Sequence, residues 1–110
     1  METKPAVASL SALAHERRIS IFRLLVQAGP DGLPAGEIAR RLDMLPNTLS
    51  AALNILSQAE LVTARRDGRS IIYTPRYDTM RDLLDFLTAD CCAGSPEICP
   101  PLAATDRCAS

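Results

Sequence analysis

The sequence predicts a mainly α-helical domain with one small β-hairpin. Two observations carry this expectation: segments with helical periodicity fill the first 60 residues, and the period then switches to two β-prone runs joined through Asp67-Gly68. The chain of 110 residues suits a single domain. We place this domain at residues 1–92 and expect an irregular, cysteine-containing tail at residues 93–110.

Three helices are expected in the first part of the chain. Residues 7–13 form the first, and residues 16–28 form the second, which is apolar nearly all round and therefore predicted to be deeply buried. The run Gly-Pro-Asp-Gly at residues 29–32 combines strong helix breakers and ends it. A third helix follows, with Pro34 near its first position and Glu37 in its first turn, both favourable there.

A fourth helix, expected over residues 47–59, has two contrasting faces. Its apolar residues recur at i, i+3, i+4 and i+7 and form a core stripe of Leu49, Ala52, Leu53 and Leu56. The opposite side is small or polar and uncharged, with Asn47, Ser50, Ala51, Asn54 and Gln58. Two helices joined by a turn of about four residues, the second with such a face, predict a helix-turn-helix.

A β-hairpin follows this helix directly. Residues 61–65 and 70–74 read as strands, and Asp67-Gly68 between them favours a tight turn because both residues tolerate positive φ. Pro75 ends the second strand. The order helix, turn, helix, hairpin is that of a winged helix-turn-helix.

The last helix is expected to begin near Asp78, a favourable N-cap residue. Its apolar residues are Met80, Leu83, Leu84, Phe86 and Leu87. This is more apolar surface than one small domain needs to cover, which favours a second subunit.

The predicted fold implies a DNA-binding surface. The second helix of the motif would enter the major groove, where Asn47 or Asn54 can bond an adenine edge. The hairpin forms the wing of this fold, and the arginines around its turn can contact backbone phosphates or enter a minor groove. The candidate DNA-binding residues are Asn47, Thr48, Ser50, Ala51, Asn54, Arg65, Arg66 and Arg69. The alternative interpretation is an ordinary solvated helix face and a soluble strand edge.

Positive charge is clustered locally, although the chain as a whole is nearly neutral. The net charge is −1, yet arginines recur in pairs at residues 17–18, 40–41 and 65–66, and phosphate contacts need local positive charge. No stretch approaches the ~20 apolar residues that span a bilayer, so we expect a cytoplasmic protein without a membrane partner. We expect no enzyme, because no catalytic constellation is evident and the only histidine, His15, is interpreted as structural.

All four cysteines lie in the last twenty residues. In a reducing compartment this clustering favours metal binding or thiol chemistry over a disulfide framework. Adjacent side chains at the end of a helix, as at Cys91 and Cys92, point about 100° apart. Cys99 joins them only if the chain folds back, for which Gly94 and Pro96 provide a turn. Three converging thiolates suit a soft ion such as arsenite or antimonite.

Several runs resemble the ArsR/SmtB family of metal-responsive repressors. They are LAHERRI at 13–19, GEIA at 36–39, NTLS at 47–50, LV at 61–62 and RDGRSIIY at 66–73. The similarity covers about residues 6 to 92 and implies a symmetric dimer, built mainly from the first and last helices, that binds operator DNA. In the family pattern T-[VL]-S-x-H-L followed by A-G-L-V, Ala52 stands here where histidine is common, and Glu60 replaces the glycine.

The tail resembles the C-terminal cysteine cluster of an arsenite-responsive subgroup of that family. This implies Cys91, Cys92 and Cys99 as ligands and leaves Cys108 outside the site. The expected function is a homodimeric repressor released from operator DNA by trivalent arsenic or antimony. The alternatives are a thiol-redox-sensing repressor, a repressor selective for methylated trivalent arsenicals or another soft metal ion, and a metalloid-sequestering module that reuses the fold.

Overall fold

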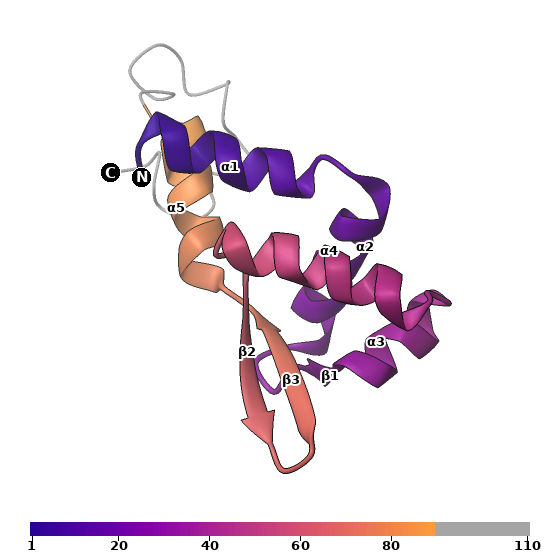
Figure 1. The fold of residues 1–110 in the computed structure, drawn as a ribbon. Helices are drawn as coiled ribbons and strands as arrows, with labels where there is room; N and C mark the ends of the chain where they lie inside the picture. The colour runs from indigo at the N-terminus through magenta and orange to yellow at the C-terminus, as the bar shows by residue number, and fades with distance from the viewer. Residues whose placement is uncertain (90–110) are drawn as a thin grey trace.

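The computed structural model describes residues 1–89, and within this range the chain forms five helices and three strands (Figure 1). In chain order they are α1 (Thr3–Leu13), α2 (Glu16–Ala28), β1 (Leu33–Pro34), α3 (Ala35–Leu42), α4 (Pro46–Gln58), β2 (Val62–Asp67), β3 (Ser70–Pro75) and α5 (Tyr77–Leu87). This order confirms the predicted winged helix-turn-helix. The proposed boundary between domain and tail lies outside the described residues.

The bounds of α2 agree with the prediction, but its burial does not. The helix begins after His15, whose Nδ1 accepts a hydrogen bond from the backbone N–H of Arg17 at 3.2 Å, and ends before Gly29 at a φ of 89°. Only one side of α2 is fully buried, and Ile19 on another side is 45% exposed. The prediction of burial all round was wrong because a helix at the surface of so small a domain is covered on one side only.

The starts of the other four helices differ from the predictions by a few residues. Pro34 is the N-cap residue of α3, and Pro46 is the first residue of α4, where a missing N–H costs no helical hydrogen bond. At α5 the N-cap residue is Arg76, so the predicted cap Asp78 lies in the first turn instead. There the carboxylate of Asp78 accepts a hydrogen bond from the guanidinium of Arg76 at 2.7 Å. The first helix, α1, begins at Thr3, four residues before the predicted start.

The sheet contains a third strand that the sequence did not reveal. β1 pairs antiparallel with β3, giving the order β1-β3-β2, with Leu33 opposite Tyr73. The chain enters β1 through Gly32 at a φ of 74°, where an added Cβ would lie 2.4 Å from the carbonyl oxygen of Tyr73. Only glycine therefore lets the backbone pass this close to β3.

The hairpin turn is displaced by one residue from the predicted position. Asp67 pairs with Ser70, so the two residues of the turn are Gly68 and Arg69 rather than Asp67 and Gly68. Gly68 has a φ of 64°, and no other residue of the turn has positive φ. This is the type II′ pattern, with glycine at the first central position, and its twist matches that of the strands.

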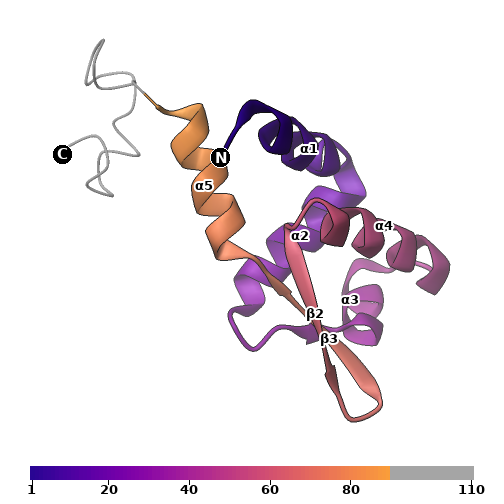
Figure 2. The same cartoon turned by 60° about the vertical axis from the view of Figure 1, so that its left-hand side comes forward.

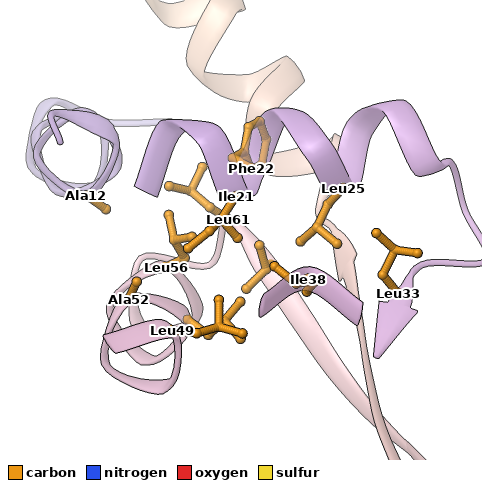
Figure 3. Close-up of a cluster of buried hydrophobic side chains, with 12 residues drawn as sticks. Ala12, Ile21, Phe22, Leu25, Leu33, Ile38, Leu49, Ala52, Leu56 and Leu61 are labelled. Atoms are coloured by element: carbon orange, nitrogen blue, oxygen red, sulfur yellow. The ribbon is translucent and has the colours of Figure 1, made fainter. Parts of the chain in front are cut away.

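The hydrophobic core lies between α2, α3 and α4 (Figure 3). All four residues of the predicted stripe on α4 are buried, which confirms the helical periodicity. They meet Ile21 and Leu25 of α2, Ile38 of α3, and Leu61 at the base of the hairpin. α4 is thus held along its inner side, and its outer side faces solvent.

Candidate nucleic-acid interface

The outer side of α4 carries the side chains that the sequence predicted for DNA recognition. Asn47, Ser50, Ala51 and Asn54 are exposed there, and we call this set the reading face. Thr48 lies at its border and is half-buried. Within residues 1–89 no side chain of the reading face forms a hydrogen bond with another protein group. Its amide and hydroxyl groups are therefore available to base edges and phosphates.

The turn between α3 and α4 fixes the angle at which the reading face is presented. Asp43 adopts left-handed geometry with a φ of 51°, and its N–H donates to the carbonyl oxygen of Arg40 at 3.4 Å. The N–H of Met44 donates to the carbonyl oxygen of Ala39 at 3.0 Å. These bonds form a Schellman motif, which satisfies the last carbonyl groups of α3 and reverses the chain within four residues.

The same motif closes α4 at its other end. The N–H of Glu60 donates to the carbonyl oxygen of Ser57 at 3.0 Å, and that of Leu61 donates to Leu56 at 2.9 Å. Glu60 has a φ of 60°, in the left-handed region where glycine is usual. Its carboxylate lies 3.3 Å from a guanidinium nitrogen of Arg76. Both reverse turns around α4 therefore use an acidic residue in a conformation that favours glycine.

The three candidate arginines of the wing are exposed, but they do not share one face. Arg65 and Arg66 are adjacent on β2, and successive residues of a strand point to opposite sides of a sheet. The guanidinium of Arg65 also donates to the carbonyl oxygen of Asp31 at 3.3 Å, which ties it to the loop before β1. Arg66 and Arg69 have no such tie within residues 1–89 and are the more available cations.

Glu37 organises two further arginines on α3. Its carboxylate accepts hydrogen bonds from Nε of Arg40 at 2.9 Å and from Nε of Arg41 at 2.7 Å. The hydrogen bonds from Arg40, then those from Arg41, lower the pKa of Glu37 to about 2. This cluster was not predicted from the sequence, although the spacing of Glu37 three and four residues before the arginines is a known signal for helical ion pairs.

Arg18 joins α1 to α2 through two hydrogen bonds. Its Nε donates to the carbonyl oxygen of Ala12 at 2.6 Å, and Nη2 donates to that of Ser11 at 3.5 Å. The guanidinium thus satisfies the last turn of α1, where four carbonyl groups lack helical partners. With the cap from His15, it fixes the α1–α2 junction, which confirms the structural role predicted for His15.

The predicted metalloid ligands Cys91, Cys92 and Cys99, and also Cys108, lie outside the described residues. Within residues 1–89 no group of three His, Cys, Asp or Glu side chains is placed to hold a metal ion. No helix in this range combines the length and the apolar character needed to cross a bilayer.

A helix-turn-helix whose second helix exposes an uncharged polar face, followed by an arginine-bearing hairpin, defines the class of winged-helix DNA-binding transcriptional regulators. A family model described as a helix-turn-helix domain matches residues 13–65. The transcriptional activator HlyU of Vibrio cholerae is 30% identical over 82 residues, which are 74% of this chain and 73% of HlyU.

A solved structure extends this similarity to the whole fold. It is the homodimeric winged helix-turn-helix DNA-binding domain of Mb0332 from Mycobacterium bovis, described as a possible ArsR-family regulator. It is 32% identical, has a TM-score of 0.65, and covers 79% of this chain and 80% of that one. The chain belongs to the ArsR family of winged-helix transcriptional regulators.

One relative carries an arsenic-related name. The "Putative arsenical resistance operon repressor ArsR" of Halobacterium salinarum is 43% identical over 63 residues, which are 57% of this chain and 48% of the relative. The names of these relatives describe different regulatory roles, an activator and a putative arsenical-resistance repressor.

Proposed function

We propose that this regulator is a homodimeric repressor that leaves its operator when trivalent arsenic or antimony binds Cys91, Cys92 and Cys99. The observation that carries the DNA-binding part is the reading face of α4, exposed and without internal hydrogen bonds, beside the arginines of the wing. The sensing part rests on the chemistry of the cysteines and on their position after α5.

Exposed apolar side chains on α1 and α5 support the dimer. Val7 and Leu10 on α1 are 58% and 42% exposed, and Leu84 and Leu87 on α5 are 39% and 52% exposed. The two helices lie at the end of the molecule opposite the hairpin tip (Figure 2). Covering these side chains with a second copy would remove apolar surface from water, which would stabilise the dimer by about 25 cal/mol for each Å² buried. A two-fold axis there would set the two copies of α4 about one DNA turn, 34–36 Å, apart.

The cysteines of the proposed sensor follow directly after α5, one of the two helices of the proposed dimer interface. α5 ends at Leu87, and Cys91 follows four residues later. Sulfur-only sites favour soft ions, and the sequence of α5 contains no histidine of the kind that zinc and nickel sensors take from this helix. Arsenous acid would exchange its three hydroxyl groups for the sulfur atoms of three thiols. Each S–H proton would leave with one hydroxyl group as water, so three water molecules are released and a neutral arsenic tris-thiolate remains.

Release of DNA then requires a difference in affinity between the two states. A ligand at the end of α5 would alter the packing of the dimer and thereby the spacing of the two reading faces. Allosteric coupling of ~1–3 kcal/mol weakens binding by about 5- to 150-fold. Because such coupling is reciprocal, operator DNA should weaken arsenite binding by the same factor.

Fluorescence anisotropy on an operator duplex, with excess phosphine reductant present, tests the proposal. We expect arsenite to release the intact protein and the Cys108→Ser variant, but not the Cys91→Ser, Cys92→Ser or Cys99→Ser variants. Unchanged operator affinity in the presence of arsenite would refute metalloid release.

The same assay separates the alternatives. Release by diamide or peroxide when the reductant is omitted, but not by arsenite when it is present, would indicate a thiol-redox repressor. Release by methylarsenite that survives the loss of one of the three cysteines would indicate a two-thiol site for methylated arsenicals. Failure of the intact protein to select any duplex from a random-sequence pool would favour metalloid sequestration.

A further inference from the structure

A small cavity lies beside α4 on the side away from α3 and the wing. Its volume is about 290 Å³. It is lined by His15, Arg17, Arg18, Thr48, Ala51, Ala52 and Ile55, and we call it the α2–α4 notch. Ala51 belongs to the reading face and Thr48 borders it, so the notch opens onto the surface that would meet DNA.

The notch holds two side chains with donor groups that the protein does not use. Arg17 is exposed, and within residues 1–89 its guanidinium forms no hydrogen bond or ion pair. His15 uses Nδ1 as an acceptor from the backbone N–H of Arg17. The neutral imidazole therefore carries its proton on Nε2, which can donate outward. Arg18 differs, because two of its nitrogens already donate to carbonyl groups of α1.

If α4 lies in a major groove, the phosphates that border the groove are potential partners for these donors. A helix seated in a groove ≈ 12 Å wide is flanked by a phosphate backbone on each side. Figure 1 shows α3 and the wing on one side of α4 and the α1–α2 junction on the other. Arg40, Arg41, Arg66 and Arg69 are exposed on the elements of the first side. On the second side, the exposed cation that lines the notch beside the reading face is Arg17.

We infer that the α2–α4 notch binds a phosphate of the DNA strand opposite the one that faces the wing. Arg17 supplies the charge and Nε2 of His15 a second donor, while Arg18 holds the junction in place. This inference rests on DNA binding by the reading face and extends it to the second strand. Such a contact is independent of base sequence and fixes the depth and tilt of α4 in the groove.

Salt dependence distinguishes a phosphate contact from a structural role. The probe is a duplex that the intact protein selects from a random-sequence pool. Each phosphate contact contributes about 0.9 to the slope of log K against log salt concentration. We expect Arg17→Ala to reduce that slope by about 1.8 for a dimer, so its affinity loss between 50 and 200 mM salt is about 12-fold smaller than that of the intact protein. Arg17→Lys should keep the slope.

Arg23→Ala is the matched control. Arg23 is exposed on the same helix, its removal changes the charge equally, and it does not line the notch. We expect its slope to equal that of the intact protein. Equal slopes for the Arg17→Ala and Arg23→Ala variants would overturn the inference while leaving DNA binding intact.

Neutral phosphates locate the contact. Replacing single phosphates by methylphosphonates should weaken the intact protein at one position per half-site, on the strand away from the wing, and should leave Arg17→Ala unaffected there. If every methylphosphonate weakens binding by the Arg17→Ala variant as much as it weakens binding by the intact protein, the inference is also overturned. Failure of the intact protein to select any duplex would overturn both this contact and the proposed function.

Discussion

Replacing Glu60 by glycine should stabilise the protein, although it removes an ion pair. A residue with a side chain at a φ of 60° carries a cost of about 1–2 kcal/mol that glycine avoids. Glycine also lowers the stability by about 0.4–1 kcal/mol, because it makes the unfolded chain more flexible. The lost pair with Arg76 is worth little, about 0.2–0.5 kcal/mol, since the Glu60 side chain is 73% exposed. The net expectation is a gain of about 0.5 kcal/mol, which corresponds to about 2–4 °C in Tm.

Glu60→Ala isolates the two contributions, because it removes the ion pair and keeps the strained backbone. We expect this variant to melt slightly below the intact protein, and the glycine variant to exceed the alanine variant by about 0.8 kcal/mol. In 1 M salt, where the Debye length falls to about 3 Å, the gap between the intact protein and Glu60→Ala should close while the gap between glycine and alanine persists.

Thermal unfolding followed by circular dichroism, at one fixed protein concentration for all variants, provides the measurement. If the glycine variant melts at or below the alanine variant, backbone strain at position 60 does not govern stability. It would then be wrong to explain the glycine that the family pattern has at position 60 by the left-handed backbone of the helix cap.

Three further outcomes are expected. The carboxyl of Glu37 should titrate in an NMR experiment with a midpoint near pH 2, because its pKa is lowered to about 2. Since the folded pKa lies below the unfolded one, the stabilisation is present above about pH 4.3 and is lost as the pH falls toward 2, so the stability gap between the intact protein and Glu37→Gln should close over that range. Gly32→Ala should lower stability by more than about 1 kcal/mol in denaturant titrations, because φ is 74° and a Cβ would lie 2.4 Å from the carbonyl oxygen of Tyr73. Leu87→Lys should shift sedimentation toward monomer while circular dichroism stays unchanged, because Leu87 is 52% exposed within one subunit; a stable dimer of this variant would place the dimer interface elsewhere.

The elements that the sequence predicted correctly are those whose signal is local and repeated. The stripe of α4 spans two helical turns, and each of its four members is buried. The breakers after Ala28 and the switch to β-prone runs are equally local, so α2 has the expected bounds and the hairpin forms with its turn displaced by one residue. The wing arginines follow from the hairpin, because residues beside a tight turn are exposed in almost any packing arrangement.

The features that escaped prediction depend on contacts between distant segments. β1 has two residues, too few for any periodicity, and exists because Gly32 lets the chain approach β3. Burial of α2 depends on how many neighbours cover it, which its own apolar composition does not specify. Arg18 gives no signal as a helix cap because its partners lie six and seven residues earlier, across a chain reversal. The substitution of glycine by Glu60 did carry a signal, but its meaning needed the left-handed φ.

The base of the hairpin constrains how a signal from α5 can reach α4. The N–H of Arg76 donates to the carbonyl oxygen of Leu61 at 2.8 Å, and the N–H of Leu61 donates to Leu56 of α4 at 2.9 Å. Leu61 is also fully buried. The start of α5 is therefore fastened to the end of α4 through backbone hydrogen bonds and a core side chain. Because packed cores deform little, a ligand beyond the far end of α5 would turn each subunit as a unit, so the proposed release acts through the spacing of two reading faces rather than through distortion of one.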